Sequence, residues 1–360
     1  MRVKLGDVCE RGSSNLKQSD VVEMKGDYPV YGASGCIGNA DFYHQENSYV
    51  AIVKDGAGIG RTTLHPAKSS VIGTMQYLLP KNNVLPEYLY YVVSYMHLEK
   101  YFTGATIPHI YFKDYKNEEF NLDSVDIQKQ VVDVLGKCEA VIESRKRELQ
   151  LLDDLIKARF VEMFGDPRSN PYGFSKKMLK DTCKVITGNT PSRSVEEYYG
   201  DYVEWIKTDN IVSGLLNPTK ASEKLSEEGM KVGRTVGKDS ILMACIAGSI
   251  ASIGRVCITD RTVAFNQQIN AVVPEDYDIL FLYVLLQSSK EYLVEEINMA
   301  LKGILSKSKL EGKEFIVPPM ELQNEFADFV HQTDKSKVAV QKALDETQLL
   351  FDSLMQQYFG

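Results

Sequence analysis

The sequence is poor in cysteine and histidine, and neither residue is spaced for chemistry. Its six cysteines form no Cys-x-x-Cys pair, and its five histidines show no metal-ligand spacing. The sequence therefore favours neither a disulfide framework nor a zinc site. We expect the cysteines to be small buried hydrophobic residues. A Gly-Lys-Ser/Thr phosphate loop is also missing from the sequence.

Long apolar runs and an excess of positive charge are missing as well. No apolar run reaches the roughly 18 residues of a membrane span, and Met1–Asp7 lacks an apolar signal region. A cytoplasmic protein without a membrane partner is expected. Lysine and arginine number 41 against 49 aspartates and glutamates, for a net charge of −8. Because phosphate contacts need cations, this balance counts against tight DNA binding by the chain alone. Local basic patches, or subunits that supply positive charge, remain open.

A helical pattern does run through the middle of the chain, from Asp126 to Gly165. Apolar residues recur mostly at steps of three or four, no proline intervenes, and the one inner glycine is Gly136. Gly165 then suits a left-handed cap, and Asp166-Pro167 cannot continue a helix. A helix of roughly 60 Å with a narrow apolar seam needs a partner. The predicted seam comprises Ile127, Val131, Leu135, Cys138, Ile142, Leu149, Leu152, Ile156, Phe160 and Met163.

The chain also repeats itself. Ile59-Gly60-Arg61 recurs 194 residues later as Ile253-Gly254-Arg255, and Phe164-Gly165 recurs as Phe359-Gly360. The offset holds over about a hundred residues, which indicates a duplication. A second long helix from 321 to 360 is the expected partner of the first, within one chain. An antiparallel pair is natural for a duplicated unit, although the sequence leaves parallel packing open.

Short strands and turns precede each long helix. In the first copy we expect a strand at Ser48–Val53, a returning strand at Ile59–His65 and a helix opening at Pro86. An irregular piece at Thr106–Ile110 and a strand at Glu119–Leu122 follow. Gly56-Ala57-Gly58-Ile59-Gly60 resembles a nucleotide loop, but a strand follows it where such a loop needs a helix, so a turn is predicted.

Two β-rich units, each followed by a long helix, resemble the specificity subunit of type I restriction–modification systems. Residues 198–211, which contain Trp205-Ile206 and Asp209-Asn210-Ile211, are similar to the family's Trp-Ile/Val-x-x-x-Asp/Asn-Ile opening of a target recognition domain. Residues 28–38 are similar to its other opening, Tyr-Pro-x-Tyr-Gly-x-x-Gly-x-Ile-Gly. The helix entries depart from the usual Pro-x-x-Glu-Gln, reading Asp126-Ile127-Gln128 and Glu321-Leu322-Gln323. The different openings imply that the two domains read different bases.

The resemblance implies an α/β (α+β) fold with two tandem recognition domains, separated by two long helices that form an intramolecular antiparallel coiled coil. The expected division is a first recognition domain at 1–122, a first spacer helix at 123–165, a linker at 166–170, a second recognition domain at 171–318 and a second spacer helix at 319–360. Each domain would read one half of a bipartite sequence in double-stranded DNA. The helices would set the spacing and dock two modification (methyltransferase) subunits, with restriction subunits in the larger complex.

On this interpretation the chain is not an enzyme and holds no cofactor. S-adenosylmethionine would belong to the modification subunit, which methylates adenine, and ATP and Mg²⁺ to the restriction subunit, an endonuclease. A self-sufficient methyltransferase is disfavoured, because Asn170-Pro171-Tyr172 falls short of the Asn-Pro-Pro-Tyr motif and lies in a linker. The alternative from another class is a duplicated coiled-coil scaffold that binds protein or glycan and no DNA; the acidic composition supports it.

Residues for DNA contact are expected near loops, where cations and polar groups can reach phosphates and bases. Arg61 and Arg255 occupy equivalent positions, and either DNA contact or a structural ion pair would explain them. The other candidates are expected in loops, with plain solvation as their alternative: Lys54, Lys113, Lys207, Thr208, Lys307 and Lys309. Trp205 and Tyr198-Tyr199 are expected to pack in the core or at a domain edge, with base stacking as the alternative. Packing at the seam is expected for Cys138 and Gln128.

Overall fold

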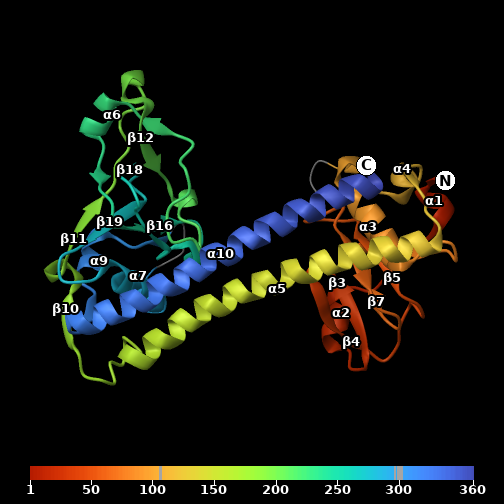
Figure 1. Ribbon diagram of the computed structural model, residues 1–360, viewed down its shortest axis with the longest axis horizontal. Coiled ribbons are helices and arrows are strands. Elements are labelled where there is room, and N and C mark those ends of the chain that lie inside the picture. Colours follow the sequence, from red (N-terminus) through yellow and green to blue (C-terminus); the bar gives the residue numbers. More distant parts are fainter. Residues whose placement is uncertain (105–107, 296, 298–302) are drawn as a thin grey trace. The chain divides into compact units, whose positions relative to one another are not determined.

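The computed structural model describes residues 1–104, 108–295, 297 and 303–360 (Figure 1). The chain forms two compact units. Unit 1 comprises Met1–Lys146 with Lys342–Gly360, and unit 2 comprises Arg147–Gln341. Two helices of 40 residues each, α5 (Val125–Phe164) and α10 (Met320–Phe359), contribute to both units. The irregular piece predicted at 106–110 begins with two residues, 106 and 107, that lie outside the described residues.

The first long helix ends where the sequence predicts, at Gly165. This glycine has φ +70°, and its N–H donates to the Val161 carbonyl oxygen at 2.8 Å. A Cβ added there would lie 2.3 Å from Cγ of Pro171. Only glycine therefore fits both the left-handed backbone and the space beside the following chain.

The two long helices pair antiparallel, and each unit shows this independently. In unit 1, Leu135 near the start of α5 shares a hydrophobic core with Met355 near the end of α10. In unit 2 the order is reversed: Phe160 near the end of α5 lies 5.5 Å, centroid to centroid, from Phe326 near the start of α10. The predicted intramolecular antiparallel pair is confirmed, and the parallel alternative is excluded.

The predicted seam is correct along most of α5 and wrong at its first residue. Val131, Ile142 and Phe160 are buried, whereas Ile127 is 46% exposed. The neighbouring Gln128 is completely buried instead. It accepts a hydrogen bond from the Leu85 N–H and donates to the carbonyl oxygens of Asn83 and Asp123. Gln128 therefore packs in the interior, as predicted, and its three hydrogen bonds make it a buried polar anchor.

The main sheet of unit 1 is antiparallel, with the strand order β2-β8-β5-β6. A second sheet has the order β4-β3-β7, and β1 pairs with β9. Helix α3 starts with proline at its first turn, as predicted, and buries Tyr88, Leu89 and Val92. The elements are β1 (Arg2–Lys4), α1 (Leu5–Val8), β2 (Cys9–Ser13), α2 (Gln18–Glu23), β3 (Tyr28–Gly32), β4 (Gly35–Ala40), β5 (Tyr49–Val53), β6 (Thr62–His65), β7 (Ser70–Val71), β8 (Met75–Pro80), α3 (Pro86–Tyr95), η1 (Leu98–Tyr101), α4 (Phe112–Tyr115) and β9 (Glu119–Asn121).

Unit 2 repeats this plan. Its main sheet has the order β11-β19-β15-β17, and these strands are equivalent to β2, β8, β5 and β6 of unit 1. The elements are β10 (Ser175–Met178), η2 (Leu179–Asp181), β11 (Cys183–Thr187), η3 (Glu196–Tyr198), β12 (Tyr199–Ile206), η4 (Thr208–Asn210), β13 (Lys224–Leu225), α6 (Glu227–Val232), β14 (Thr235–Val236), β15 (Ile241–Ala244), β16 (Ile246–Ala247), η5 (Ile250–Ser252), β17 (Val256–Ile258), β18 (Val263–Phe265), β19 (Ile269–Pro274), α7 (Ile279–Ser288), α8 (Lys290–Val294), β20 (Gly303–Ile304), α9 (Lys307–Glu311) and β21 (Glu314–Val317).

Strand register confirms the duplication. Cys9 lies opposite Pro80 in unit 1, and Cys183 lies opposite Pro274 in unit 2. The two family-like openings also fall on equivalent strands. Val30 of β3 pairs with Ser70 of β7, and Trp205 of β12 pairs with Ala264 of β18, both in parallel. The two openings are therefore alternative sequences for one structural position.

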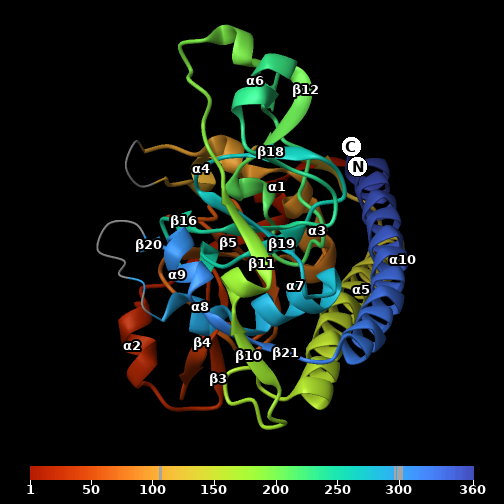
Figure 2. The ribbon, with the colours of Figure 1, turned by 90° about the vertical axis from the view of Figure 1, so that its left-hand side faces the viewer.

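The units differ most in the connection between the two main-sheet strands that come first along the chain. These are β2 and β5 in unit 1, and β11 and β15 in unit 2. Unit 1 uses residues 14–48 for this connection, and unit 2 uses residues 188–240, which include the long β12, β13 and α6. In Figures 1 and 2, α6 and the start of β12 extend beyond the main sheet of unit 2. No helix in the described residues is apolar over enough of its length to cross a bilayer.

Candidate nucleic-acid interface

Arg61 and Arg255 end equivalent loops in the two units. Each follows a glycine with positive φ, +82° at Gly60 and +76° at Gly254. These glycines close the loops alike: Gly60 N–H donates to the Val53 carbonyl at 2.9 Å, and Gly254 N–H to the Ala244 carbonyl at 2.8 Å. Positive φ at Gly58 and Gly60 also keeps residues 59–61 out of the strand, so β6 begins at Thr62 and not at Ile59 as predicted.

Both arginines reach the same place, the chain just beyond the strand β3 or β12. Arg61 Nη1 donates to the Ala33 carbonyl at 2.8 Å, and Arg255 Nη2 donates to the Thr208 carbonyl at 3.3 Å. Ala33 follows Tyr31 by two residues, and Thr208 follows Ile206 by two, while Tyr31 and Ile206 hold equivalent positions in their strands. Each arginine therefore ties a hairpin loop to a strand end.

Neither arginine forms an ion pair within the part of the chain that the structure describes. The structural ion-pair alternative is therefore wrong, and a backbone carbonyl takes its place. Arg61 is exposed and Arg255 half-buried. A guanidinium carries five N–H donors, so each keeps donors beyond those used in these bonds. DNA contact by Arg61 and Arg255 stays a prediction.

In unit 1, Lys54 and Arg61 line one open hollow. Lys17 lines it too, with Ser14 and Ser34. The Lys54 ammonium lies 3.6 Å from the Asp55 carboxylate, which in turn lies 2.6 Å from Nδ1 of His109. Lys54 is thus partly neutralised. Sequence reasoning missed Lys17, because no motif surrounds it and only the folded chain brings it beside Arg61.

In unit 2, Lys207 belongs to a cluster around Trp205. The indole is 3% exposed and shares a core with Val203 and Leu225, as predicted. The Lys207 ammonium lies 5.2 Å from its ring centroid and pairs with the Glu223 carboxylate. Arg193, which sequence reasoning missed, approaches the same ring and the same carboxylate.

Three of the predicted loop lysines lie on short helices instead. Lys113 is in α4, and Lys307 and Lys309 are in α9, which Ser306 caps by accepting from the Lys309 N–H at 3.3 Å. Thr208 starts the 3₁₀ turn η4. The Lys307 ammonium lies 3.5 Å from Glu311, whereas that of Lys309 has no partner among the residues described.

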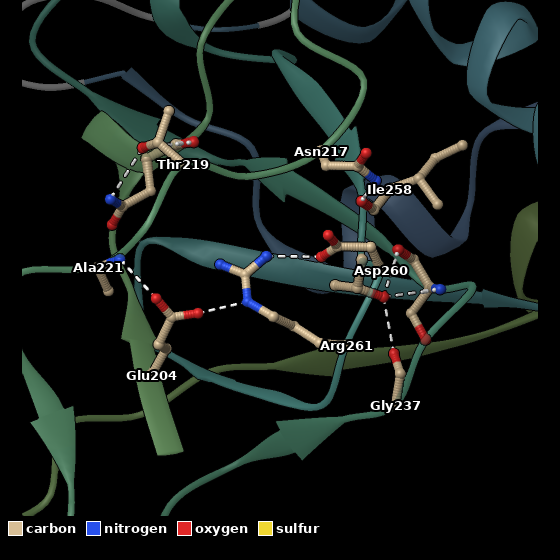
Figure 3. Close-up of polar contacts among 11 residues, drawn as sticks. Glu204, Asn217, Thr219, Ala221, Gly237, Ile258, Asp260 and Arg261 are labelled. Carbon is tan, nitrogen blue, oxygen red and sulfur yellow. Dashed lines mark hydrogen bonds and ion pairs between the residues drawn. The ribbon is translucent and has the colours of Figure 1, made fainter. Parts of the chain in front are cut away.

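Side-chain hydrogen bonds fix the chain that follows β12 to neighbouring strands and loops (Figure 3). Asn217 Nδ2 donates to the Ile258 carbonyl at 2.8 Å, and the Ala221 N–H donates to Glu204 at 3.1 Å. Glu204 pairs with Arg261, which also bonds to Asp260 at 2.6 Å. The loop from Thr208 to Ala221 therefore has a defined shape, which a surface that distinguishes bases needs.

Four of the six cysteines are buried, and Asn170 belongs to a turn. Burial raises the pKa of the Cys183 and Cys245 thiols to about 12, which keeps them protonated. Cys9 and Cys257 are buried too, but Cys36 is exposed and Cys138 only half-buried, so the expectation of buried cysteines is wrong for these two. Asn170 bonds through its side chain to the Phe174 N–H and carbonyl and forms a turn. No cluster of His, Cys, Asp and Glu in the described chain could hold a metal ion.

Two known proteins resemble this chain, one over less than half of its length and one over about three quarters. The Haemophilus influenzae type I restriction enzyme HindI specificity subunit is 32% identical over 158 residues, which span 42% of this chain and 33% of that relative. The Methanocaldococcus jannaschii type I restriction enzyme MjaIX specificity subunit is 24% identical over 309 residues, 77% of this chain and 69% of that one. The chain thus spans a third of the first relative and about two thirds of the second.

Solved structures share the fold. The type I restriction–modification S subunit from M. genitalium superposes with a TM-score of 0.64 at 13% identity, over 100% of this chain and 96% of that one. A chain from a structure describing assembly and conformational transition of the type I R-M system gives 0.55 at 15% identity, over 99% and 97%. The model of the type I restriction modification DNA specificity domain matches the sequence twice, at residues 1–153 and 171–347. The chain therefore belongs to the family of type I restriction–modification DNA specificity proteins.

Proposed function

We propose that this chain is the non-catalytic DNA specificity subunit of a type I restriction–modification enzyme, and that each recognition domain reads one half of a bipartite target. The observation that carries this proposal is the duplicated sheet, which has the same strand order and register in both units. Two copies of one scaffold suit two half-sites. Double-stranded DNA is the ligand.

The segments that differ between the copies are the candidate base-reading parts. Residues 14–48 and 188–240 connect equivalent strands with different lengths and sequences. At the end of β3, unit 1 has Gly32-Ala33. At the equivalent position beside the end of β12, unit 2 has Lys207-Thr208. Different donors and acceptors at one structural position support the reading of different bases.

The paired helices would set the spacing between the half-sites and dock the modification subunits. Several large apolar side chains on α5 and α10 are exposed, including Leu151 at 58%, Val338 at 70% and Leu349 at 70%. Apolar side chains exposed on a helix pair suit a protein partner better than DNA. Two methyltransferase subunits, and restriction subunits in a larger assembly, would supply the chemistry. The complex would act in the cytoplasm.

The cofactors would lie outside this chain. S-adenosylmethionine would bind the modification subunits, which methylate adenine. ATP and Mg²⁺ would bind the restriction subunits, which cut DNA. A scaffold that binds protein or glycan without DNA is the rival function, and the net charge of −8 is its support.

Three measurements test the proposal together. Co-expression with the neighbouring genes should copurify an adenine methyltransferase. Sequencing of methylated bases in host DNA should reveal a bipartite motif with a fixed gap, and deletion of this gene should abolish it. The lone chain, incubated with DNA and S-adenosylmethionine, should transfer no methyl group. Absence of both the partner and the methylation motif would leave the scaffold function as the better account.

A further inference from the structure

Two cationic side chains lie near the ring of Trp205, the only tryptophan in the sequence. In unit 2 the Arg193 guanidinium and the Lys207 ammonium each lie 5.2 Å from the Trp205 ring centroid. Arg193 also lies 4.7 Å from the centroid of Tyr199. The indole is held in place because its Nε1–H donates to the Asn189 carbonyl at 3.3 Å. Aromatic faces attract cations without neutralising their charge.

A single carboxylate bridges these two cations. Glu223 Oε2 lies 2.6 Å from Arg193 Nη2, and Oε1 accepts from the Lys207 ammonium. Hydrogen bonding from Lys207, and further from Arg193, keeps the pKa of Glu223 below its ordinary value, so the carboxylate is charged at neutral pH. One net positive charge remains on the cluster. Arg193 is 58% exposed, and its guanidinium has N–H donors beyond the one that bonds to Glu223.

We propose that Arg193 and Lys207 form a binding site for a phosphodiester of the DNA backbone, and that Glu223 is a competing anion that holds the two cations until DNA binds. The inference rests on the proposed function and adds one defined contact to it. A carboxylate and a phosphate offer the same paired acceptor oxygens to a guanidinium. The cations are therefore already spaced for a phosphate. Glu223 weakens the binding of any phosphate that must displace it.

The site belongs to unit 2 alone. Val30 is the residue of unit 1 that is equivalent to Trp205. Val30 pairs with Ser70 of β7 in the same way as Trp205 pairs with Ala264 of β18. Two residues further on, Lys207 is replaced by Gly32. Unit 1 therefore offers neither the aromatic ring nor the lysine. The phosphate contact should fall in one half-site of the target and not in the other.

Salt dependence measures the proposed contact directly. The assembled complex with its modification subunits is titrated onto a mixed-sequence duplex of about 30 base pairs, close to three helical turns, over a series of salt concentrations. Each phosphate contact contributes about 0.9 to the slope of log K against log salt. Arg193→Met and Lys207→Met should each flatten the slope by about that amount. Glu223→Gln should tighten binding and steepen the slope.

A neighbouring pair supplies the matched control. Lys224 lies 3.3 Å from Asp201, which is 94% exposed, and neither side chain has a cation–π contact with a ring among the residues that the structure describes. Asp201→Asn changes the net charge by the same amount as Glu223→Gln. It should leave the slope and the affinity near those of the wild type. If Asp201→Asn matched Glu223→Gln, the effect would be general electrostatics and the site would be disproved.

Trp205 itself gives a second readout, because its emission reports on this cluster alone in the isolated full chain. Binding of the same duplex at low salt should change the emission, and Arg193→Met should reduce that change. Anisotropy of labelled DNA that shows binding while Trp205 emission stays constant would overturn the proposal. A wild-type complex that bound no duplex at all would instead refute the proposed function.

Discussion

Replacing Gln128 with leucine tests how α5 is fixed in unit 1. The side chain is fully buried. Its Oε1 accepts from the Leu85 N–H at 2.9 Å, and its Nε2 donates to the carbonyl oxygens of Asn83 at 3.0 Å and Asp123 at 2.9 Å. Leu85 is the residue that precedes the first turn of α3. One side chain thus joins the start of α3 to the start of α5.

The structure sets the size of the effect. Leucine has a similar volume, so no large cavity arises, but three hydrogen bonds disappear and three backbone groups lose a partner. At a net of about 1 kcal/mol for each bond, the loss is about 3 kcal/mol. This is a large share of the 5–15 kcal/mol that typically stabilise a domain. Gln323 makes two such bonds, to the Asp278 N–H and the Pro318 carbonyl, so Gln323→Leu should cost about 2 kcal/mol in unit 2.

Urea denaturation of the full chain, followed by circular dichroism, measures these losses, and hydrogen exchange at the Leu85 amide locates the first of them. Gln150→Leu is the matched control, because Gln150 is exposed on the same helix and its side chain bonds, within the described part of the chain, only to Asp154 at 3.1 Å. Its cost should stay below about 0.5 kcal/mol. If Gln128→Leu were as mild as Gln150→Leu, the buried amide would not anchor the helix and the reasoning would be refuted.

Three further predictions concern the loops, the helices and Glu223. Arg61→Met should free the Ala33 carbonyl and speed amide exchange around residues 33–35 in unit 1 alone, and Arg255→Met should do the same after Thr208 in unit 2; unchanged exchange would mean that the bonds do not hold these loops. Deleting one heptad from each of α5 and α10 should shift the gap in the methylated motif, and an unshifted gap would exclude a spacer role. Because hydrogen bonds from Lys207, and further from Arg193, lower the folded-state pKa of Glu223, its pairing should persist above the unfolded pKa of a glutamate and be lost only as pH falls through the lower folded value. Trp205 emission should therefore change only below the usual glutamate range, and an acid transition that survived in Glu223→Gln would contradict this.

Local patterns in the sequence were enough for the large features. The apolar period of 126–165, the stop at Gly165 and the recurrence of Ile-Gly-Arg predicted two long helices and a duplicated unit, because each depends on neighbouring residues or on comparison of the chain with itself. The α/β (α+β) fold class came from the family resemblance. The same local logic failed at Ile127, which fits the apolar period but is exposed.

Contacts between distant residues were decided only by the tertiary structure. The direction of the helix pair depends on which end of α10 meets Leu135, and no period records that. Arg61 meets Ala33, and Arg193 meets Glu223, across loops whose lengths and sequences follow no repeat. A side chain's role at such a site is set by the groups that folding brings within a few ångströms of it. Composition and spacing show that the chain carries arginines and lysines near strand ends, but only the fold shows which carbonyl, ring or carboxylate each one meets.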